Sequence, residues 1–171
     1  MLNPVLLDKS LWTYVPKFIC SNEGELKNYI ERALEQRNNL KRYPLVILDL
    51  KGETCYGTTS LYNVSFENET IAIGYTIIGK EFHKTHVNRN SKILLMEYTF
   101  EDLKMERVEF FIDTLNQNSV VSLLKLGIKH EGILRSNIAT QFGRRRDTTV
   151  MSLLADEWPH IKAKIKKKSE Q

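Results

Sequence analysis

The chain has 171 residues, of which 42% are hydrophobic and 27% are charged, an ordinary globular composition with enough length for one well-buried core. Its two cysteines, Cys20 and Cys55, have no neighbouring cysteine and no paired histidines at metal-ligand spacing, which argues against a disulfide framework and against a zinc site. No segment approaches membrane-spanning length and the first residues lack the pattern of a signal peptide. We therefore expect one domain over residues 1–171, a cytoplasmic protein with reduced thiols, and no membrane partner.

The net charge of +4 comes entirely from the C-terminal part of the chain. Residues 141–171 hold eight Lys and Arg against four Asp and Glu, whereas residues 1–140 hold seventeen of each kind. Such basic clusters can attract nucleic acid or an anionic cofactor. We favour the alternative of a solvated helix end for the lysines, because no aromatic residues interleave with them and nucleic acid is therefore not an expected partner. The clusters are Arg144, Arg145 and Arg146, and then Lys162, Lys164, Lys166, Lys167 and Lys168.

The first half of the chain predicts one helix followed by three strands. Residues 22–38 open with Asn22 and with Glu25 three positions later, the pattern of a capped helix start, and place their apolar side chains on one face. After Pro44 come three runs rich in β-branched and aromatic residues, separated by short polar turns. These runs predict antiparallel strands at 45–50, 54–64 and 71–78.

The second half alternates helices and strands. Apolar residues at helical spacing predict a helix over 88–105, Asn116 is typical of a helix cap, and Gly127 stands where a helix usually ends. The remaining predicted elements are a strand at 108–112, a helix at 119–126, strands at 128–140 and 148–154 joined by a turn at Gly143, and a helix from Trp158 and Pro159 into the basic tail at 158–171. This order implies an α/β (α+β) fold with a mixed sheet and helices packed on it.

Three ordered groups of residues resemble the GNAT superfamily of acetyltransferases, and within it the RimJ/RimL-like branch of ribosomal-protein N-terminal acetyltransferases. The resemblance covers about residues 10–165 and implies a largely antiparallel mixed sheet flanked by helices. It further implies that acetyl-CoA binds where two central strands splay apart, and that an amine attacks the thioester directly. The groups are residues 73–76 with 85–88 and Lys92, residues 116–119 with 125–127, and residues 131–135 with 143–147.

The resemblance assigns the cofactor's pyrophosphate to the loop that enters the second helix. Backbone N–H groups and the helix dipole at such a start suit phosphate. The family's usual glycines are absent here, so we expect the loop to avoid positive φ and side chains to supply contacts. The alternative is an ordinary polar loop capped by Asn88. The candidate residues are Lys84, Thr85, His86, Val87, Asn88, Arg89 and Lys92.

The resemblance also implies roles at the reacting end of the cofactor. Gly74 and Tyr75 match the distorted strand that binds the pantetheine arm and polarises the thioester carbonyl through a backbone N–H, a place where a strand glycine would also mark a bulge. Asn116 and Ser119 match residues that contact CoA, and Ser119 is the candidate general acid that protonates the departing thiolate. The alternative for this pair is a helix cap with an ordinary first-turn serine.

The general base stays open. The family often has an acidic residue two positions before the strand glycine, but Ala72 stands there in this chain. A water chain or an amine that is already partly neutral would replace the missing carboxylate. The acidic residues nearby in sequence, each expected to be a solvated loop charge, are Glu67, Glu69 and Glu81.

Two further matches are structural. Arg146 and Asp147 are expected to form an ion pair or to shape the turn before the last strand, and Trp158 is expected to pack at the start of the last helix. Relatives usually begin with a further strand that this chain lacks. The corresponding edge of the sheet would then be vacant, filled by residues 1–7, or filled by another subunit, which leaves a homodimer open.

The sequence therefore predicts an enzyme that moves an acetyl group from acetyl-CoA to a primary amine, either on a protein N-terminus or on a small molecule. No metal is implied, because the chemistry is amine attack on an activated thioester and no ligand cluster is present. Ala72 and the glycine-free loop motivate an alternative from another class, a catalytically impaired CoA-binding module of the same fold.

Overall fold

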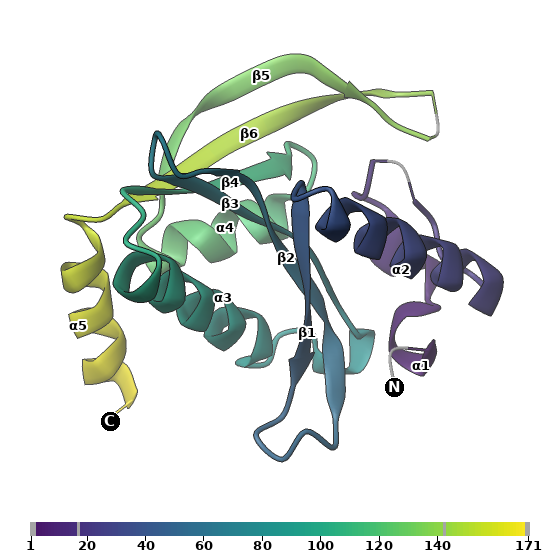
Figure 1. The fold of residues 1–171 in the computed structure, drawn as a ribbon, viewed down its shortest axis with the longest axis horizontal. Helices are drawn as coiled ribbons and strands as arrows, with labels where there is room; N and C mark the ends of the chain where they lie inside the picture. The colour runs from purple at the N-terminus through teal and green to yellow at the C-terminus, as the bar shows by residue number, and fades with distance from the viewer. Residues whose placement is uncertain (1–2, 17, 142, 170–171) are drawn as a thin grey trace.

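The computed structural model describes residues 3–16, 18–141 and 143–169, with side chains over 5–16, 18–141 and 143–165. Its elements follow the predicted order, with short helical segments added at the beginning and between elements (Figure 1). In chain order they are α1 (Asn3–Leu6), η1 (Lys9–Trp12), α2 (Glu23–Asn38), β1 (Arg42–Leu48), β2 (Cys55–Ser65), β3 (Thr70–Ile78), η2 (Lys80–Phe82), α3 (Val87–Glu97), η3 (Tyr98–Asp102), β4 (Arg107–Asp113), α4 (Gln117–Leu126), β5 (Lys129–Ala139), β6 (Arg145–Leu154) and α5 (Trp158–Ser169).

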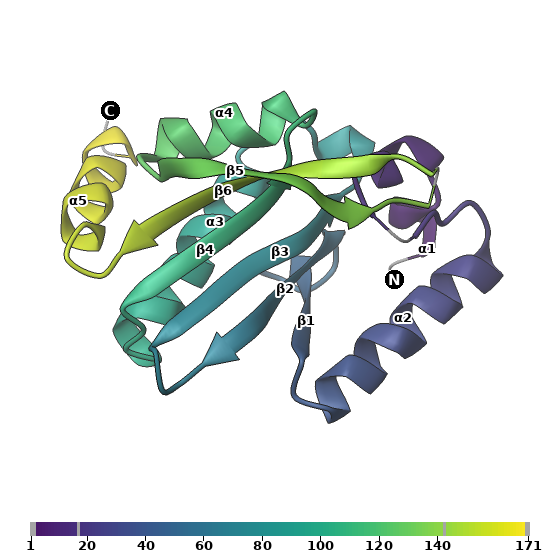
Figure 2. The same cartoon turned by 90° about the horizontal axis from the view of Figure 1, so that it is seen from above.

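The strands form one six-stranded sheet in the order β1-β2-β3-β4-β6-β5, visible from above in Figure 2. Every neighbouring pair is antiparallel except β3 and β4, which run parallel. A parallel pair needs a crossover, and α3 with η3 provides it. The prediction of a mixed, largely antiparallel sheet flanked by helices is confirmed.

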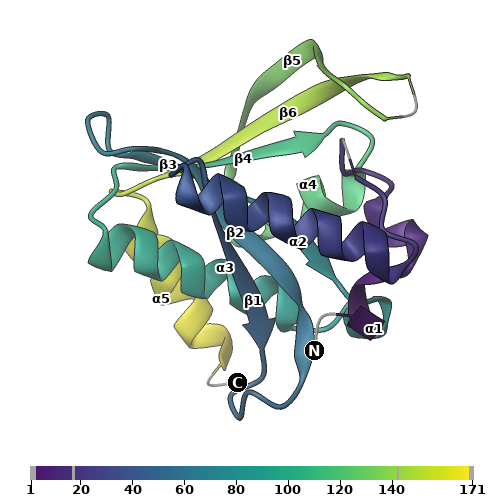
Figure 3. The ribbon, with the colours of Figure 1, turned by 45° about the vertical axis from the view of Figure 1, so that its right-hand side comes forward.

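Helices cover both faces of the sheet. On one face α3, α4 and α5 bury the larger core, which centres on Met96, Leu123 and Trp158 against the inward residues of β2, β3, β4 and β6. On the other face α1, η1 and α2 bury a smaller core around Leu6, Trp12 and Tyr29. Figure 3 shows α2 in front of β1 and β2, with α3 and α5 behind the sheet.

The predicted helix caps are confirmed. The side chain of Asn22 accepts a hydrogen bond from the amide of Glu25, and the side chain of Asn116 accepts one from the amide of Ser119. Gly127 ends α4 with φ 93, the left-handed conformation that a side chain disfavours.

Two predicted boundaries are wrong. β1 begins at Arg42 and includes Pro44, which an edge strand tolerates because its missing N–H can face away from the neighbouring strand. The helix predicted over 88–105 is regular only to Glu97 and then continues as a π-helical turn, Tyr98–Asp102. Lys104, at φ 55, lies outside any helix, so the apolar spacing ran past the true end.

The N-terminal segment does not extend the sheet. Residues 3–6 form the helix α1, so of the three alternatives for the sheet edge, filling by residues 1–7 is excluded for the residues that the structure describes. Residues 1 and 2 lie outside the described part of the chain. In that described part β1 stands at one edge of the sheet and β5 at the other.

The basic C-terminal residues are partly engaged in local contacts. Lys162 forms ion pairs with Glu97 and Glu101, although a solvated helix end was expected there. Glu101 also accepts a hydrogen bond from the indole N–H of Trp158 at 2.7 Å, which confirms that this tryptophan packs at the start of α5. The side chains of Lys166, Lys167 and Lys168 lie outside the described residues.

Candidate functional site

The central feature is a fork between the two parallel strands. β3 pairs with β4 only from Thr70 to Ala72, opposite Arg107 to Glu109, and beyond that point their register ends. β4 continues to pair with β6 along its whole length, while β3 continues with β2. Because parallel strands end at the same edge of a sheet, α3 and α4, which follow β3 and β4, both start at the open end of the fork.

A bulge at Tyr75 distorts β3 beside this opening. The register with β2 passes from Ser60 opposite Gly74 to Thr58 opposite Ile77, so β3 carries one extra residue. Tyr75 has φ 53, which is uncommon for a residue with a side chain. The predicted distortion is confirmed, but it lies at the tyrosine and not at the glycine. Tyr75 has no register partner on β2 or β4, so its backbone is outside both ladders.

Gly74 is required for a different reason. A Cβ on this residue would lie 2.8 Å from Cε1 of Tyr62, because the Tyr62 ring packs against β3 at this point. Tyr62 also meets the ring of Tyr75 edge to face, with 5.1 Å between centroids. Burial raises the pKa of the Tyr62 phenol, so this hydroxyl stays protonated and can donate a hydrogen bond.

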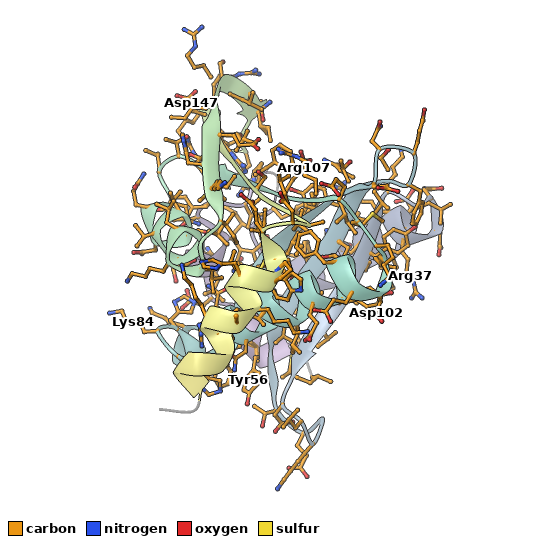
Figure 4. The ribbon with its side chains drawn as sticks, turned by 90° about the vertical axis from the view of Figure 1, so that its left-hand side faces the viewer. Arg37, Tyr56, Lys84, Asp102, Arg107 and Asp147 are labelled. Carbon is orange, nitrogen blue, oxygen red and sulfur yellow. The ribbon has the colours of Figure 1, made fainter. Side chains whose placement is uncertain are left out.

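The predicted cofactor loop leads into α3, but its details differ from the expectation. α3 begins at Val87, its cap residue is His86, and no side chain of the cap accepts a hydrogen bond. Asn88 therefore does not cap the helix. Lys84 has φ 61, so the expectation that the loop avoids positive φ is wrong at this residue. Its side chain lies at the periphery of the molecule (Figure 4).

The first turn of α3 has backbone donors to offer. Thr85 accepts a hydrogen bond from the amide of Val87 through its hydroxyl, and the amide of Asn90 bonds to the carbonyl of His86. The amides of Asn88 and Arg89 bond to no group in the described part of the chain. Two adjacent free N–H groups at a helix N-terminus are the arrangement that commonly binds phosphate and other anions in proteins.

Asn88 and Lys92 instead form a pair one turn apart on α3, in which Lys92 is buried and Asn88 is half-buried. The ammonium of Lys92 donates to the side-chain oxygen of Asn88, and Lys92 is only 5% exposed. Burial lowers the pKa of Lys92 to about 8, because desolvation disfavours the charged form. No carboxylate forms an ion pair with Lys92 among the side chains that the structure describes.

At the start of α4, Asn116 and Ser119 lie in the first turn as predicted. Asn116 caps the helix, with its side-chain oxygen 3.2 Å from the amide of Ser119. The Ser119 hydroxyl is half-buried and has no hydrogen bond to a described group. The predicted site residues thus fall on β3, on the start of α4, or on α3 and the loop that leads into it, which are the elements that border the fork.

A carboxylate missed by sequence reasoning stands beside Ala72. The strand register places Glu109 of β4 directly opposite Ala72, on the same face of the sheet. Glu109 is half-buried, and one of its oxygens accepts a hydrogen bond from Nε of Arg107 at 2.9 Å. Only the pairing of two distant strands reveals this position. The acidic residues named from sequence, Glu67, Glu69 and Glu81, are exposed.

The segment that resembles the family's Arg-Asp motif is built differently from the expectation. Arg144 forms an ion pair with the buried Asp113. Arg146 is 5% exposed and donates to the carbonyl of Phe111 at 2.9 Å, while Asp147 accepts from the amide of Ser136 at 2.6 Å. Arg146 and Asp147 are therefore not paired with each other, and both tie β6 to its neighbours.

An open groove of about 750 Å³ runs along the outer side of α2. It faces the turn between β5 and β6, whose Gln141 donates to the carbonyl of Phe18 at 2.9 Å. The groove is lined by Phe18, Ile19, Glu25, Asn28, Glu31, Arg32, Glu35 and Gln141. Three carboxylates against one guanidinium give it an acidic lining.

Within residues 3–16, 18–141 and 143–169, no three or more His, Cys, Asp or Glu side chains are grouped so that they could hold a metal ion. In the same ranges no helix is long and apolar enough to cross a membrane.

Comparison with known proteins identifies the family. Residues 2–129 match the family model described as "Acetyltransferase (GNAT) domain", and the chain belongs to this family. Members of this family are acetyltransferases. The chain is thus an acetyltransferase, as the sequence predicted.

Three relatives show how close the likeness is. The chain is 28% identical over 133 residues to "Probable N-acetyltransferase YjcK" of Bacillus subtilis (strain 168), covering 77% of this chain and 72% of that protein. It is 32% identical over 107 residues to "Putative ribosomal N-acetyltransferase YdaF" of the same organism, covering 63% of this chain and 57% of that protein. The crystal structure of a "putative acetyltransferase" from T. thermophilus superposes with a TM-score of 0.86 at 30% identity, covering 96% of this chain and 87% of that one.

Proposed function

We propose that this protein is an acetyl-CoA-dependent N-acetyltransferase of the RimJ/RimL-like branch that acetylates a primary amine. The observation that carries the proposal is the fork between β3 and β4, opened beside the Tyr75 bulge and flanked at its open end by two helix starts. A flexible thioester arm fits such a gap, since its polar groups can bond to strand backbone that has no strand partner. The similarity to YdaF supports the branch.

The pyrophosphate of the cofactor would lie at the start of α3. The free amides of Asn88 and Arg89 point along the helix axis, and the dipole adds to their attraction for anions. Lys92 lies one turn further along the helix and is buried. A bound phosphate would favour the protonated, positively charged form of its amine and so offset the effect of burial on its pKa. Arg89 adds an always-charged guanidinium.

The reaction would then proceed at Tyr75. The amine nitrogen attacks the thioester carbonyl carbon, and the negative charge that develops on the carbonyl oxygen is met by the backbone N–H of Tyr75. As the carbon–sulfur bond breaks, the hydroxyl of Ser119 gives its proton to the departing thiolate and recovers one from solvent. The product is an amide and free CoA.

Glu109 is our candidate for the group that takes the proton from the attacking amine. It lies opposite Ala72, so its carboxylate is one strand away from the position that carries the acid in many relatives. One of its oxygens is held by Arg107, and the other has no hydrogen bond to a described group. Replacement by glutamine keeps the shape and removes the basic oxygen, so E109Q should lower kcat at neutral pH and lose less at higher pH, where free amine is more abundant.

The competing possibility is a CoA-binding module that has lost catalysis. Ala72 and the absence of glycine from the cofactor loop favour it, because both depart from the family pattern. Turnover separates the two functions. Acetyl-CoA consumption with a panel of primary amines, including peptides with a free N-terminus, would exclude the inactive module.

Titration calorimetry with acetyl-CoA and with CoA is the first test. We expect saturable binding that weakens about tenfold or more in K92M, which removes the buried charge, and in N88A, which removes the side-chain oxygen that holds the Lys92 ammonium. K125M is the matched control, since Lys125 is exposed on α4 and away from the α3 start. Failure of the unaltered protein to bind either compound would contradict the proposed function.

A further inference from the structure

Arg42 is a buried guanidinium without a counter-ion. It is the first residue of β1 and is 3% exposed. Its Nε donates to the hydroxyl of Ser60 at 2.8 Å and its Nη2 to the hydroxyl of Tyr29 at 2.6 Å. Among the side chains that the structure describes, no carboxylate forms an ion pair with it.

The neutral contacts leave this group incompletely satisfied. A guanidinium has five N–H donors and stays charged at any physiological pH. The two bonds to hydroxyls use two of the five, and Nη1 donates to no described group. Buried charges are normally paired, because the loss of hydration is otherwise strongly unfavourable. The arrangement is therefore one in which an added anion would be stabilised.

This charge lies against the side chain of the residue whose backbone forms the candidate reacting centre. The central carbon of the Arg42 guanidinium is 3.8 Å from the centre of the Tyr75 ring, and Tyr75 is the bulge residue of β3. Arg42 and Tyr62 are paired across β1 and β2, and Tyr62 in turn is paired with Ala72, so these side chains share one face of the sheet. That face is opposite the larger core and is the side on which α2 packs.

A second buried guanidinium approaches from the other side. Arg146 interacts electrostatically with both Tyr62 and Tyr75, and it forms no ion pair among the described residues. Asp113, whose charge also acts on Arg146, forms its ion pair with Arg144. The Tyr62–Tyr75 pair is thus flanked by two buried positive charges that belong to different strands.

We propose that the acceptor is a primary amine that carries a carboxylate a few bonds from its nitrogen, and that Arg42 binds this carboxylate. The inference rests on the proposed function, since it assumes that the amine reacts beside Tyr75. The planar fork of a guanidinium matches a carboxylate in two parallel hydrogen bonds. Such a contact would fix the acceptor's orientation while its amine faces the thioester.

Matched acceptor pairs test the proposal. Initial rates with acetyl-CoA are measured for β-alanine against β-alaninamide and for 4-aminobutyrate against 4-aminobutanamide, with a basic peptide bearing a free N-terminus as a third class. We expect the carboxylate of at least one pair to react about tenfold or more faster than its amide, as for a lost hydrogen bond to a charged group. The amine of each amide compound is less basic, so more of it is neutral and reactive at a given pH. This difference favours the amide and therefore works against the expected result.

Variants assign the preference to Arg42. In R42Q the ratio of carboxylate to amide turnover should fall towards one, whereas R42K, which keeps the charge, should retain part of it. R37Q is the matched control, because Arg37 is an exposed arginine near the end of α2. Circular dichroism confirms folding of each variant, and R42K keeps the test decisive if R42Q does not fold.

A binding measurement separates this proposal from the proposed function. Thermal stabilisation by N-acetyl-β-alanine, with and without CoA, reports the carboxylate site even if no amine is turned over. Stabilisation that is lost in R42Q or reduced in R42K, and kept in R37Q, supports the site. Equal rates for carboxylate and amide, a preference for the basic peptide, or no stabilisation by the probe would overturn it. The basic-peptide result would assign acceptor choice to the acidic groove along α2.

Discussion

The ring of Tyr62 lies on the backbone of Gly74, so close that a methyl group on the glycine would come within 3.2 Å of the tyrosine hydroxyl. We therefore expect Gly74→Ala to push the ring off β3 and disturb the bulge that follows. Overpacking of this kind costs about 1–3 kcal/mol. Urea denaturation should show the loss in the free energy of unfolding, and acetyl transfer should fall with it.

Gly132→Ala is the control for that substitution. Gly132 lies in β5, a Cβ there would meet nothing within 4 Å, and its φ is not in the left-handed region. We expect its stability to match the unaltered protein within experimental error. Equal losses in the two variants would mean that the contact with Tyr62 is not the cause.

The buried ammonium of Lys92 should make stability depend on pH above neutrality. Its pKa falls from 10.5 to about 8 on folding, so the unfolded chain binds more protons between these values and the contribution to stability rises with pH across that window. Below pH 8 the penalty is complete, at most about 3 kcal/mol for a shift of this size. We expect Lys92→Met to be more stable than the unaltered protein at pH 7 and to lose that advantage between pH 8 and 10.5. Urea denaturation at several pH values, with Lys125→Met alongside, checks this; a difference that does not change with pH would contradict it.

The Arg107–Glu131 ion pair should make stability depend on pH in the acid range, where stability again rises with pH. Hydrogen bonds from Arg107 and then Ser152 lower the pKa of Glu131 from 4.5 to about 2. A carboxyl whose pKa is depressed on folding contributes stability that is complete above its unfolded pKa and is lost as the pH falls towards 2. Since the Glu131 side chain is 39% exposed, solvent screening reduces the expected contribution to about 1 kcal/mol.

Glu131→Gln checks that contribution. We expect the variant to be less stable than the unaltered protein at pH 7 and equal to it near pH 2, by urea denaturation. Glu35→Gln removes an exposed charge of α2 and should show no such convergence. A constant difference between pH 7 and pH 2 would exclude ionisation of Glu131 as the source.

Removal of the Ser119 hydroxyl should affect chemistry and not cofactor binding. If it protonates the thiolate, Ser119→Ala lowers kcat about 100-fold, the usual range for a general acid, while the KM for acetyl-CoA changes little. The neighbouring Ser122, whose hydroxyl bonds back to the Ser119 carbonyl, provides the control Ser122→Ala. A rise in KM with an unchanged kcat would give Ser119 a binding role only.

Much of the fold could be predicted because its signals are local. Asn22 and Asn116 are side chains that satisfy the amides of a helix start, and Gly127 adopts a backbone angle that other residues avoid, so each marks a boundary by itself. The predicted end of the second helix was wrong because no local signal marks it. Apolar residues continue at helical spacing through the π-helical turn Tyr98–Asp102, where the backbone hydrogen-bond pattern changes. The sequence gives no sign of that change.

The site was predictable only in part for the same reason. Gly74 and Tyr75 could be placed at a bulge from sequence, yet the positive φ falls on the tyrosine because the glycine is needed where Tyr62 lies over the strand. Glu109 and Arg42 could not be found at all. Glu109 is noticed because the strand register places it opposite Ala72, and Arg42 because the folded chain buries it without a carboxylate partner. Both features depend on segments that are distant in the sequence.

The bonds from Gln141 to Pro16 and Phe18 affect how the chain folds during synthesis. The amide of Gln141 bonds to the carbonyl of Pro16 and its side chain to that of Phe18, so the tip of the last hairpin holds one of the first loops of the chain. The ribosome releases that loop long before the hairpin. Contacts across so much sequence form late and slow the search for the native state. The groove along α2, which Phe18 and Gln141 help to line, is therefore expected to form late in the folding of the nascent protein.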